Sequence, residues 1–533
     1  MATLIDSIGG RTVDGHRPWP RVEVDAERWR HAAAQFAAGQ WTLLGLWGET
    51  DAVHMAVLRA DDDETAVISL ACPDGTFPSV GALHPPAIRL ERAVADLFGL
   101  APVGAPDTRP WLDLGFWDVT YPLSTAVIPG RTEGASPESI TPALGDIDSG
   151  PAASRRPGMS HPARSYAFLP VEGDNLHQIP VGPVHAGIIE PGHFRFTANG
   201  ETVVRLEQRL GYVHKGIEAL MAGAALDTAA RLAGRTSGDS TVAYALAFAH
   251  AVEAALEVQA PPRAVYLRAL MAELERIANH FGDFGAICND ASFTLMHAQC
   301  YVLREQTLRA SNACFGHRLM MDCIVPGGIA HDLASGGAAQ VSILLQEVRR
   351  IFPELVELYD NTASLQDRTV TTGILRAELA RQFGVGGYVG RASGRAFDVR
   401  KALAYPPYDQ LEFAIAGHDG GDVDARVRVR IAEIEQSLSL IEQILRRLPD
   451  GPIQAAVAPV PGERREGMGL VEGFRGDVLV WLRLDGERVA RCHLRDPSWF
   501  QWPLLEAVIE GNIVADFPLC NKSFNCSYSG HDL

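Results

Sequence analysis

The spacing of apolar and polar residues divides the chain into two unlike parts. Before residue 130, strand-like apolar runs at residues 41–46, 54–58 and 66–70 alternate with stretches of helical spacing. The helical stretches include residues 26–35 and 88–98. Such alternation predicts an α+β domain in the N-terminal part of the chain.

After residue 205 the apolar residues recur every three or four positions, which is the spacing of amphipathic helices. This spacing extends over residues 206–221, 240–258, 262–284, 293–315, 336–359, 377–382 and 423–448. In the last segment we interpret one apolar stripe as core rather than as a recognition surface; it comprises Val427, Ile431, Ile434, Leu438, Ile441 and Leu445. Short strand-like runs precede these helices, at residues 179–204. We therefore predict a mainly α-helical bundle domain with a small β-sheet region at its start.

Residues 130–165 are rich in Pro, Gly, Ser and Ala and have no hydrophobic period, which is typical of a linker. A chain of 533 residues is also too long for one ordinary core. We expect an N-terminal α+β domain over residues 1–129, the linker over 130–165, and the helical domain over 166–533.

Composition narrows the class of protein. A formal net charge of −18 argues against a nucleic-acid partner. The N-terminus does not have the pattern of a secretory signal, and no uncharged apolar run reaches the roughly 18 residues needed to span a bilayer. The eight cysteines form no C-x-x-C pair and are expected to be reduced, buried or incidental thiols. We therefore expect a cytoplasmic chain that does not itself cross a membrane.

Four polar features interrupt the apolar pattern. They are the turn Gly182–Gly187, the segment Tyr212–Glu218, the turn Arg231–Tyr244 and the tail Ala515–Leu533. Each has an ordinary explanation when taken singly.

His185 could be a turn histidine bonded to a neighbouring carbonyl. His214 and Glu218 are four residues apart and could form a solvated pair on one helix face. Asp239 or Ser240 could cap a helix that starts at Thr241. No nucleophile elbow, phosphate loop or dinucleotide motif is present.

The order of these features and their amino-acid sequences resemble those of one family. The segments are "PVGPVHAGIIEPGHFRF", "GYVHKGIE", "RAVYLRALMAELERIANH", "DRTVTTGILRAELAR" and "GYVGRASGRAFDVRK". They are similar to the large subunit of the membrane-bound group 4 [NiFe] hydrogenases of the formate hydrogenlyase type and, more distantly, to the D-type subunit of NADH:quinone oxidoreductase (complex I). "ERAVADLFGLAPVGAPDTRPWL" resembles the signature of the C-type subunit of complex I. Fusions of the C and D types are typical of formate hydrogenlyase-type large subunits.

The resemblance implies where a nickel–iron centre would be held. In such hydrogenases four thiolates bind the metals, two from each of two C-x-x-C motifs, because these metals need soft anionic ligands. The matching positions here are Ala233, Thr236, Ser527 and Gly530. All four thiolates are missing, and Cys526 is one place away from its motif. We therefore expect no nickel–iron centre, no other metal site and no hydrogen chemistry; the absence of a His-terminated extension after Leu533 agrees with this expectation.

The resemblance to the D-type subunit of complex I suggests a different use for the same cavity. That subunit binds a quinone headgroup through a histidine, which matches His185, and a tyrosine, whose aligned position is Gly234 here. The polar residues that would remain in the cavity are His185, His214, Glu218, Arg235, Asp239, Ser240 and Arg475. A buried Glu beside a His or Arg suits proton transfer, so we hypothesise this role for Glu218.

The resemblance thus implies a peripheral redox subunit on the cytoplasmic side of the membrane, coupled to proton translocation and not active alone. No cofactor is expected on this chain, although a quinone or another small redox molecule could occupy the cavity. The implied partners are a small iron–sulfur subunit similar to the B-type subunit of complex I with a 4Fe-4S cluster, a ferredoxin-like iron–sulfur subunit and integral membrane subunits. Two alternatives remain open: a catalytically dead structural subunit, and a hydrogenase-like enzyme with a different metal.

Overall fold

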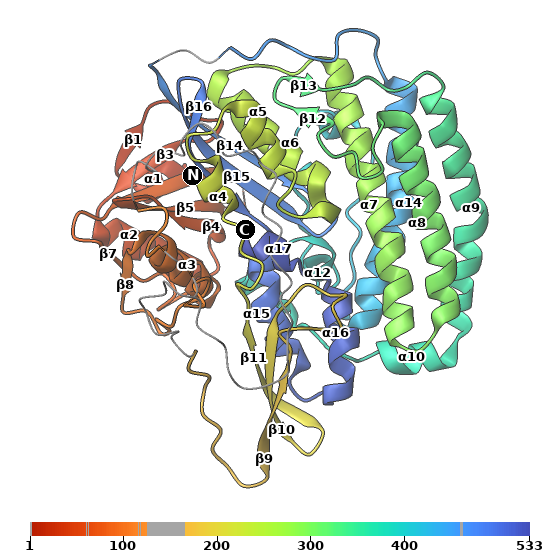
Figure 1. The fold of residues 1–533 in the computed structure, drawn as a ribbon, viewed down its shortest axis with the longest axis horizontal. Helices are drawn as coiled ribbons and strands as arrows, with labels where there is room; N and C mark the ends of the chain where they lie inside the picture. Colours follow the sequence, from red (N-terminus) through yellow and green to blue (C-terminus); the bar gives the residue numbers. More distant parts are fainter. Residues whose placement is uncertain are drawn as a thin grey trace, which may run out of the picture.

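The computed structural model describes residues 3–59, 61, 63–115, 117, 119–124, 166–458 and 462–533. The predicted linker, residues 130–165, lies outside the described residues. Figure 1 shows the N-terminal unit on one side of a central sheet and the long helices on the other side.

The N-terminal unit is built on a five-stranded sheet with the order β1-β3-β6-β5-β4. Its strands are β1 (Arg11–Val13), β3 (Arg21–Val24), β4 (Thr42–Gly48), β5 (Ala52–Arg59) and β6 (Glu64–Ala71), with β7 (Thr76–Pro78) and β8 (Ala101–Val103) paired separately. Its helices are α1 (Leu4–Ile8), α2 (Ala26–Ala37) and α3 (Ile88–Phe98). Asp25 caps α2 by accepting the Arg28 N–H, and α3 ends at Gly99, whose φ is 75°. The structure therefore has the expected mixture of strands and helices here.

A second sheet, which the sequence patterns did not reveal, joins the two parts of the chain. It has the order β16-β15-β14-β2 and consists of β14 (Arg464–Glu472), β15 (Asp477–Asp485), β16 (Arg488–Arg495) and the short N-terminal strand β2 (His16–Arg17). The two sheets pack on each other, with the rings of Trp47 and Trp481 5.6 Å apart. This packing explains why β4, β5 and β6 are buried along nearly their whole length.

The helical domain is dominated by five helices. They are α6 (Thr241–Leu256), α7 (Pro262–Asp290), α8 (Thr294–Phe315), α9 (Gly337–Asn361) and α14 (Val423–Arg447). Figure 1 shows α7, α8, α9 and α14 side by side. Five members of the predicted stripe on α14 are buried and Leu445 is partly buried, so the stripe is core. Shorter elements complete the domain: β12 (Ile324–Val325), β13 (Gly328–Ile329), α10 (Ala363–Thr369), α11 (Ala377–Gln382), α12 (Gly387–Arg391) and α13 (Val399–Ala402).

The start of this domain differs in part from the prediction. The expected small β region is an antiparallel sheet of β9 (Leu176–Val181), β10 (His193–Asn199) and β11 (Thr202–Arg209). The helix expected over residues 206–221 is wrong, because only α4 (Ile217–Met221) is helical there. Gly211 and Gly216 have φ angles of 99° and 68°, and this left-handed backbone interrupts a helix. A Cβ on Gly211 would also approach the Leu112 carbonyl oxygen to 2.9 Å.

The C-terminal tail folds back into the interior. It follows α15 (Ser498–Ile509) and contains α16 (Phe517–Phe524) and α17 (Tyr528–Asp532), and residues 526–533 are all buried. Asp532 Oδ2 accepts the N–H groups of Gly211 (2.9 Å) and Val213 (3.0 Å). The Leu533 carbonyl accepts the Lys215 N–H at 2.8 Å. These bonds place the end of the tail beside the "GYVHKGIE" segment. Within the described ranges, no helix is both long and apolar enough to cross a membrane.

Candidate functional site

The turn at residues 231–244 meets the C-terminal tail, as the resemblance implied. It begins at the end of α5 (Leu226–Ala233) and runs into α6, and the Thr241 hydroxyl closes it by donating to the Gly234 carbonyl at 2.6 Å. Across from it, the hydroxyl oxygens of Ser237 and Ser527 lie 3.0 Å apart. Two segments separated by almost 300 residues of sequence therefore form one site.

Arg475 lies between the turn and the tail and bonds to both. Its Nη2 donates to Asp239 Oδ2 at 2.6 Å, and its Nη1 donates to the Ser240 hydroxyl at 3.0 Å. Its Nε donates to the Asn525 carbonyl at 2.6 Å. Burial raises the pKa of Asp239, but the Arg475 charge and its hydrogen bonds outweigh burial and hold this pKa below its usual value. The arginine and the carboxylate therefore form a charged pair at neutral pH.

A polar chamber of about 290 Å³ opens beside this pair. Its polar lining residues include Glu190, Ser237, Asp239, Arg475, Asn525, Ser527 and Ser529. A second hollow of about 280 Å³ adjoins it, and Ile189, Asn525, Cys526 and Tyr528 border both. The second hollow has a more apolar lining that includes Val181, Phe194, Phe517 and Pro518. Together the two hollows offer a polar space next to an apolar one.

His185 lines the apolar hollow rather than the polar chamber. Its Nε2 lies 2.7 Å from the Gly192 carbonyl oxygen, so one ring nitrogen is bonded to a backbone carbonyl seven residues along the chain. This bond is the ordinary role considered from the sequence, yet the ring still borders the space next to the Arg475–Asp239 pair.

His214 and Glu218 line a different hollow, of about 320 Å³ and mainly apolar, which is also lined by Leu533 at the end of the tail. They do not share a helix face, because α4 begins only at Ile217. His214 Nδ1 lies 2.6 Å from the Asp532 carbonyl oxygen, and its ring packs on Trp117. The structure thus places both candidates away from the polar chamber.

Glu218 is buried in an ionic cluster. Its carboxylate lies 2.8 Å from Arg491 Nη2 and 2.8 Å from His493 Nδ1, and it accepts the Leu494 N–H at 3.0 Å. Burial alone would raise the pKa of Glu218, but Arg491 and His493 reverse that effect and lower the pKa to about 2. Glu218 is therefore ionised at neutral pH.

Arg235 lies on the surface. Its guanidinium forms a two-pronged pair with Asp322, at 2.6 and 2.7 Å, and its side chain is 42% exposed. Arg235 therefore does not contribute to the polar chamber, contrary to the placement expected from the sequence. Asp239 and Arg475 are the two candidates that the structure brings together there.

The four positions aligned with metal ligands do not fit a nickel–iron centre. Ala233 and Thr236 are fully buried and do not line the chamber. The Ser527 hydroxyl accepts the Gly530 N–H at 2.9 Å and so caps α17. A methyl, two hydroxyls and a glycine do not supply the soft anionic donors that such a centre needs. Among the described residues, no three His, Cys, Asp or Glu side chains gather in a way that could hold a metal ion.

Two further residues of the site were not among the sequence candidates. Asp496 and Tyr244 are both fully buried, and the Tyr244 hydroxyl donates to Asp496 Oδ2 at 2.7 Å. The Ser498 N–H donates to Asp496 Oδ1 at 2.8 Å, which anchors the carboxylate at the start of α15. Burial and the Asp496 charge raise the pKa of Tyr244 well above its usual value, so its hydroxyl keeps its proton. The Asp-Pro-Ser sequence at residues 496–498 was the only local signal for Asp496.

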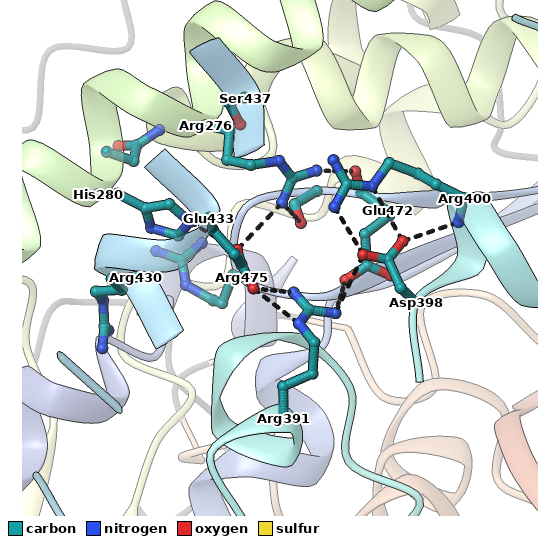
Figure 2. Close-up of polar contacts among 12 residues, drawn as sticks. Arg276, His280, Arg391, Asp398, Arg400, Arg430, Glu433, Ser437, Glu472 and Arg475 are labelled. Atoms are coloured by element: carbon teal, nitrogen blue, oxygen red, sulfur yellow. Dashed lines mark hydrogen bonds and ion pairs between the residues drawn. The ribbon is translucent and has the colours of Figure 1, made fainter. Parts of the chain in front are cut away.

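A buried ionic network supports the end of β14, directly before the turn that carries Arg475 (Figure 2). Arg276 donates to the carbonyls of Glu472 (2.9 Å) and Gly473 (3.0 Å). Arg391 bridges the carboxylates of Glu433 (2.7 Å) and Glu472 (2.8 Å). Because these groups are almost completely buried, their pairing fixes their geometry. The network therefore holds the segment before Arg475 in one position.

Comparison with known proteins identifies the family. A profile of the respiratory-chain NADH dehydrogenase 30 Kd subunit matches residues 22–132, and a profile of the 49 Kd subunit matches residues 290–468. The chain belongs to the family in which these two subunit types are fused, a family related to the large subunits of group 4 [NiFe] hydrogenases.

Individual relatives agree with this assignment. Formate hydrogenlyase subunit 5 of Escherichia coli is 32% identical over 461 residues, which cover 86% of this chain and 77% of the relative. The C/D subunit of the NADH-quinone oxidoreductase of Bacteroides thetaiotaomicron is 28% identical over 85% of this chain and 84% of the relative. In the structure of the membrane-bound sulfane sulfur reductase, an archaeal respiratory membrane complex, one chain aligns with a TM-score of 0.64 and 25% identity. That alignment covers 68% of this chain and 100% of that chain.

Proposed function

We propose that this chain is a peripheral, cytoplasmic-side subunit of a membrane-bound, complex I-like and hydrogenase-related redox complex. In this proposal a 4Fe-4S cluster on a small iron–sulfur partner similar to the B-type subunit of complex I exchanges electrons with a small molecule held in the polar chamber. A ferredoxin-like iron–sulfur subunit and integral membrane subunits complete the assembly. The chain itself contributes the chamber and no metal.

The observation that carries the proposal is the open chamber of about 290 Å³ beside the Arg475–Asp239 pair. A guanidinium held by its partners can donate a hydrogen bond to a carbonyl oxygen of a ligand without rearranging. The adjoining apolar hollow, with His185 on its wall, suits the ring and tail of a quinone or a similar amphipathic molecule. The relationship to a component of an NADH-quinone oxidoreductase supports this ligand class.

Proton translocation, if coupled to this chamber, needs a group that can change its protonation near neutral pH. Arg491 and His493 hold Glu218 ionised, so Glu218 is less suited to the proton-transfer role that was considered for it from the sequence. Glu275 on α7 is a better candidate, because its carboxylate contacts the start of α6 directly behind the chamber turn. Burial, assisted by Asp239, raises the pKa of Glu275 to about 8.

The test uses the intact membrane complex purified with this chain. Electron transfer is measured from the reduced iron–sulfur partner to a soluble short-chain quinone, for native protein and for the Arg475→Met and Asp239→Asn variants. Removing either member of the pair is expected to slow this transfer at least about tenfold, because one charged hydrogen bond to the ligand or its support is lost. Metal analysis of the same preparation is expected to find no stoichiometric nickel.

Arg235→Met is the matched control, since Arg235 is also paired with an aspartate but lies on the surface. It should transfer electrons at the native rate. If the Arg475 and Asp239 variants also transferred electrons at the native rate, the chamber would be idle and the chain would be a structural subunit. Stoichiometric nickel, or another metal bound by this chain, would instead support a hydrogenase-like enzyme.

A further inference from the structure

We infer that a metal-free polar clamp joins the tail to the turn at residues 231–244, and that Asp496 fills the space of the side chain missing at position 530. The clamp consists of Arg475, the Ser237–Ser527 pair and the Asp496–Tyr244 pair. It links the same two segments that a metal centre would link through the four aligned ligand positions. This inference concerns the architecture of the site and does not depend on which molecule enters the chamber.

Three links cross between the two segments, and each joins a different pair of elements. Arg475 bonds Asp239 in the turn and the Asn525 carbonyl before the tail helix α17. The hydroxyls of Ser237 and Ser527 lie 3.0 Å apart, and Ser527 at the same time caps α17 through the Gly530 N–H. The clamp thus engages the first turn of α17 directly.

The third link runs through Asp496. Tyr244, on the first turn of α6, donates to Asp496 Oδ2 at 2.7 Å, and the same oxygen is the atom nearest to where a Cβ on Gly530 of α17 would lie. A Cβ built on Gly530 would lie 2.7 Å from Asp496 Cγ and closer still to Oδ2, and 2.9 Å from the Ser527 hydroxyl. Real Cβ atoms do not approach other atoms so closely, so any side chain at 530 would have to displace Asp496 or the tail.

The Asp496 carboxylate cannot move aside easily. It is fully buried, and it is bonded on one oxygen by Tyr244 and on the other by the Ser498 N–H. Moving it would leave a buried phenol and a buried amide without partners. Asp496 therefore leaves no room for a side chain at position 530, and a glycine is required there.

The first experiment measures whether Gly530 and Asp496 are coupled. Hydrogen exchange of residues 526–533 is followed by mass spectrometry in the full-length chain, for Gly530→Ala, Asp496→Ala and the double variant. Gly530→Ala is expected to speed exchange of the tail about tenfold or more, because overpacking destabilises the docked state. In the Asp496→Ala background the same alanine is expected to change exchange less than about threefold.

Gly238→Ala is the control, because Gly238 also lines the chamber but a Cβ there would meet nothing within 4 Å. It should leave exchange of the tail at the native rate. Native exchange in Gly530→Ala, or an equal effect of this alanine with and without Asp496, would overturn the inference.

A second experiment measures the consequence for metal binding. The four aligned positions are changed by Ala233→Cys, Thr236→Cys, Ser527→Cys and Gly530→Cys, and Co²⁺ is titrated while thiolate-to-cobalt absorption is recorded. With Asp496 present, the spectrum of four-thiolate coordination is expected to be absent; adding Asp496→Ala is expected to allow it. Four-thiolate coordination with Asp496 intact would show that the carboxylate does not fill the ligand space.

Discussion

Replacing Glu218 by glutamine distinguishes an ion-paired structural carboxylate from a proton carrier. Glu218 is only 4% exposed, and its pKa is lowered from 4.5 to about 2 against the cost of burial, by Arg491 and His493. Since each pKa unit corresponds to about 1.4 kcal/mol, ionised Glu218 contributes about 3 kcal/mol to the free energy of unfolding at neutral pH. Glutamine would lose this contribution and leave the Arg491 charge buried with one partner fewer.

The dependence on pH has a definite sign. A carboxyl whose pKa is depressed in the folded state stabilises the protein above its unfolded pKa, and this stabilisation is lost as the pH falls through the folded pKa. The difference in unfolding free energy between native protein and Glu218→Gln is therefore expected to be constant from pH 7 to pH 6. It is expected to fall to about half at pH 3.

Thermal unfolding of the purified chain provides the assay. If the whole chain unfolds as one unit, a loss of about 3 kcal/mol lowers the melting temperature by about 3 °C at pH 7, given about 2 cal/mol/K of unfolding entropy per residue. Glu487→Gln is the control, since Glu487 is exposed on the turn between β15 and β16 and should melt like the native protein. An unchanged melting temperature in Glu218→Gln, combined with lost proton uptake in the assembled complex, would refute the structural role and restore the proton role.

Two other carboxylates give further predictions. The pKa of Glu275 is raised to about 8 chiefly by burial, so the stability that Glu275 contributes is fully present below pH 4.5 and is lost as the pH rises through 8. The melting temperature of Glu275→Gln should therefore rise relative to that of the native protein from pH 5 to pH 8. Melting temperatures that change in parallel over this range would contradict the prediction. Glu433 pairs with buried Arg391, so Glu433→Gln should lower the unfolding free energy by about 3–5 kcal/mol in denaturant titrations. On the same helix, Glu442→Gln, which removes a half-exposed pair with Arg349, should cost less than about 1 kcal/mol, and equal losses would contradict the buried pairing.

Regular spacing was enough to predict the long helices, because the apolar face of α7, α8, α9 or α14 repeats over many turns. The sheet of β14, β15 and β16 was not predicted, because the residue pattern of β14 is explained by its packing against a helix that is distant in sequence. A Cβ on Gly467 or Gly469 of β14 would overlap the carbonyls of Ala251 or Ala247, so these glycines let the alanine-rich helix α6 lie directly on the strand. The pattern of small residues in each element is meaningful only when both are seen together.

The candidate site was predictable to a similar extent. Asp239 and Arg475 could be proposed because the family motifs place them, and the structure brings them together. The sequence could not show that Arg235 differs from Asp239. The two residues are close together in one tight turn, and only the conformation of that turn directs Arg235 to Asp322 and Asp239 to the chamber. Asp496 could not be found at all by looking for missing thiolates, because it contacts an aligned position without being one.

The clamp changes how the polarity of the chamber should be interpreted. A dead cavity would be expected to fill with apolar side chains, and the polar residues in the turn therefore favoured a working site. In the structure Arg475, Asp239, Ser237 and Ser527 satisfy one another's hydrogen bonds, so their polarity is already explained by the joining of turn and tail. What the clamp does not explain is the hollow that remains: about 290 Å³ stays open beside a charged pair, close to the lower end of the roughly 300–1,000 Å³ that is typical of ligand pockets. It is this volume, more than the polarity of its walls, that argues for a molecule bound there.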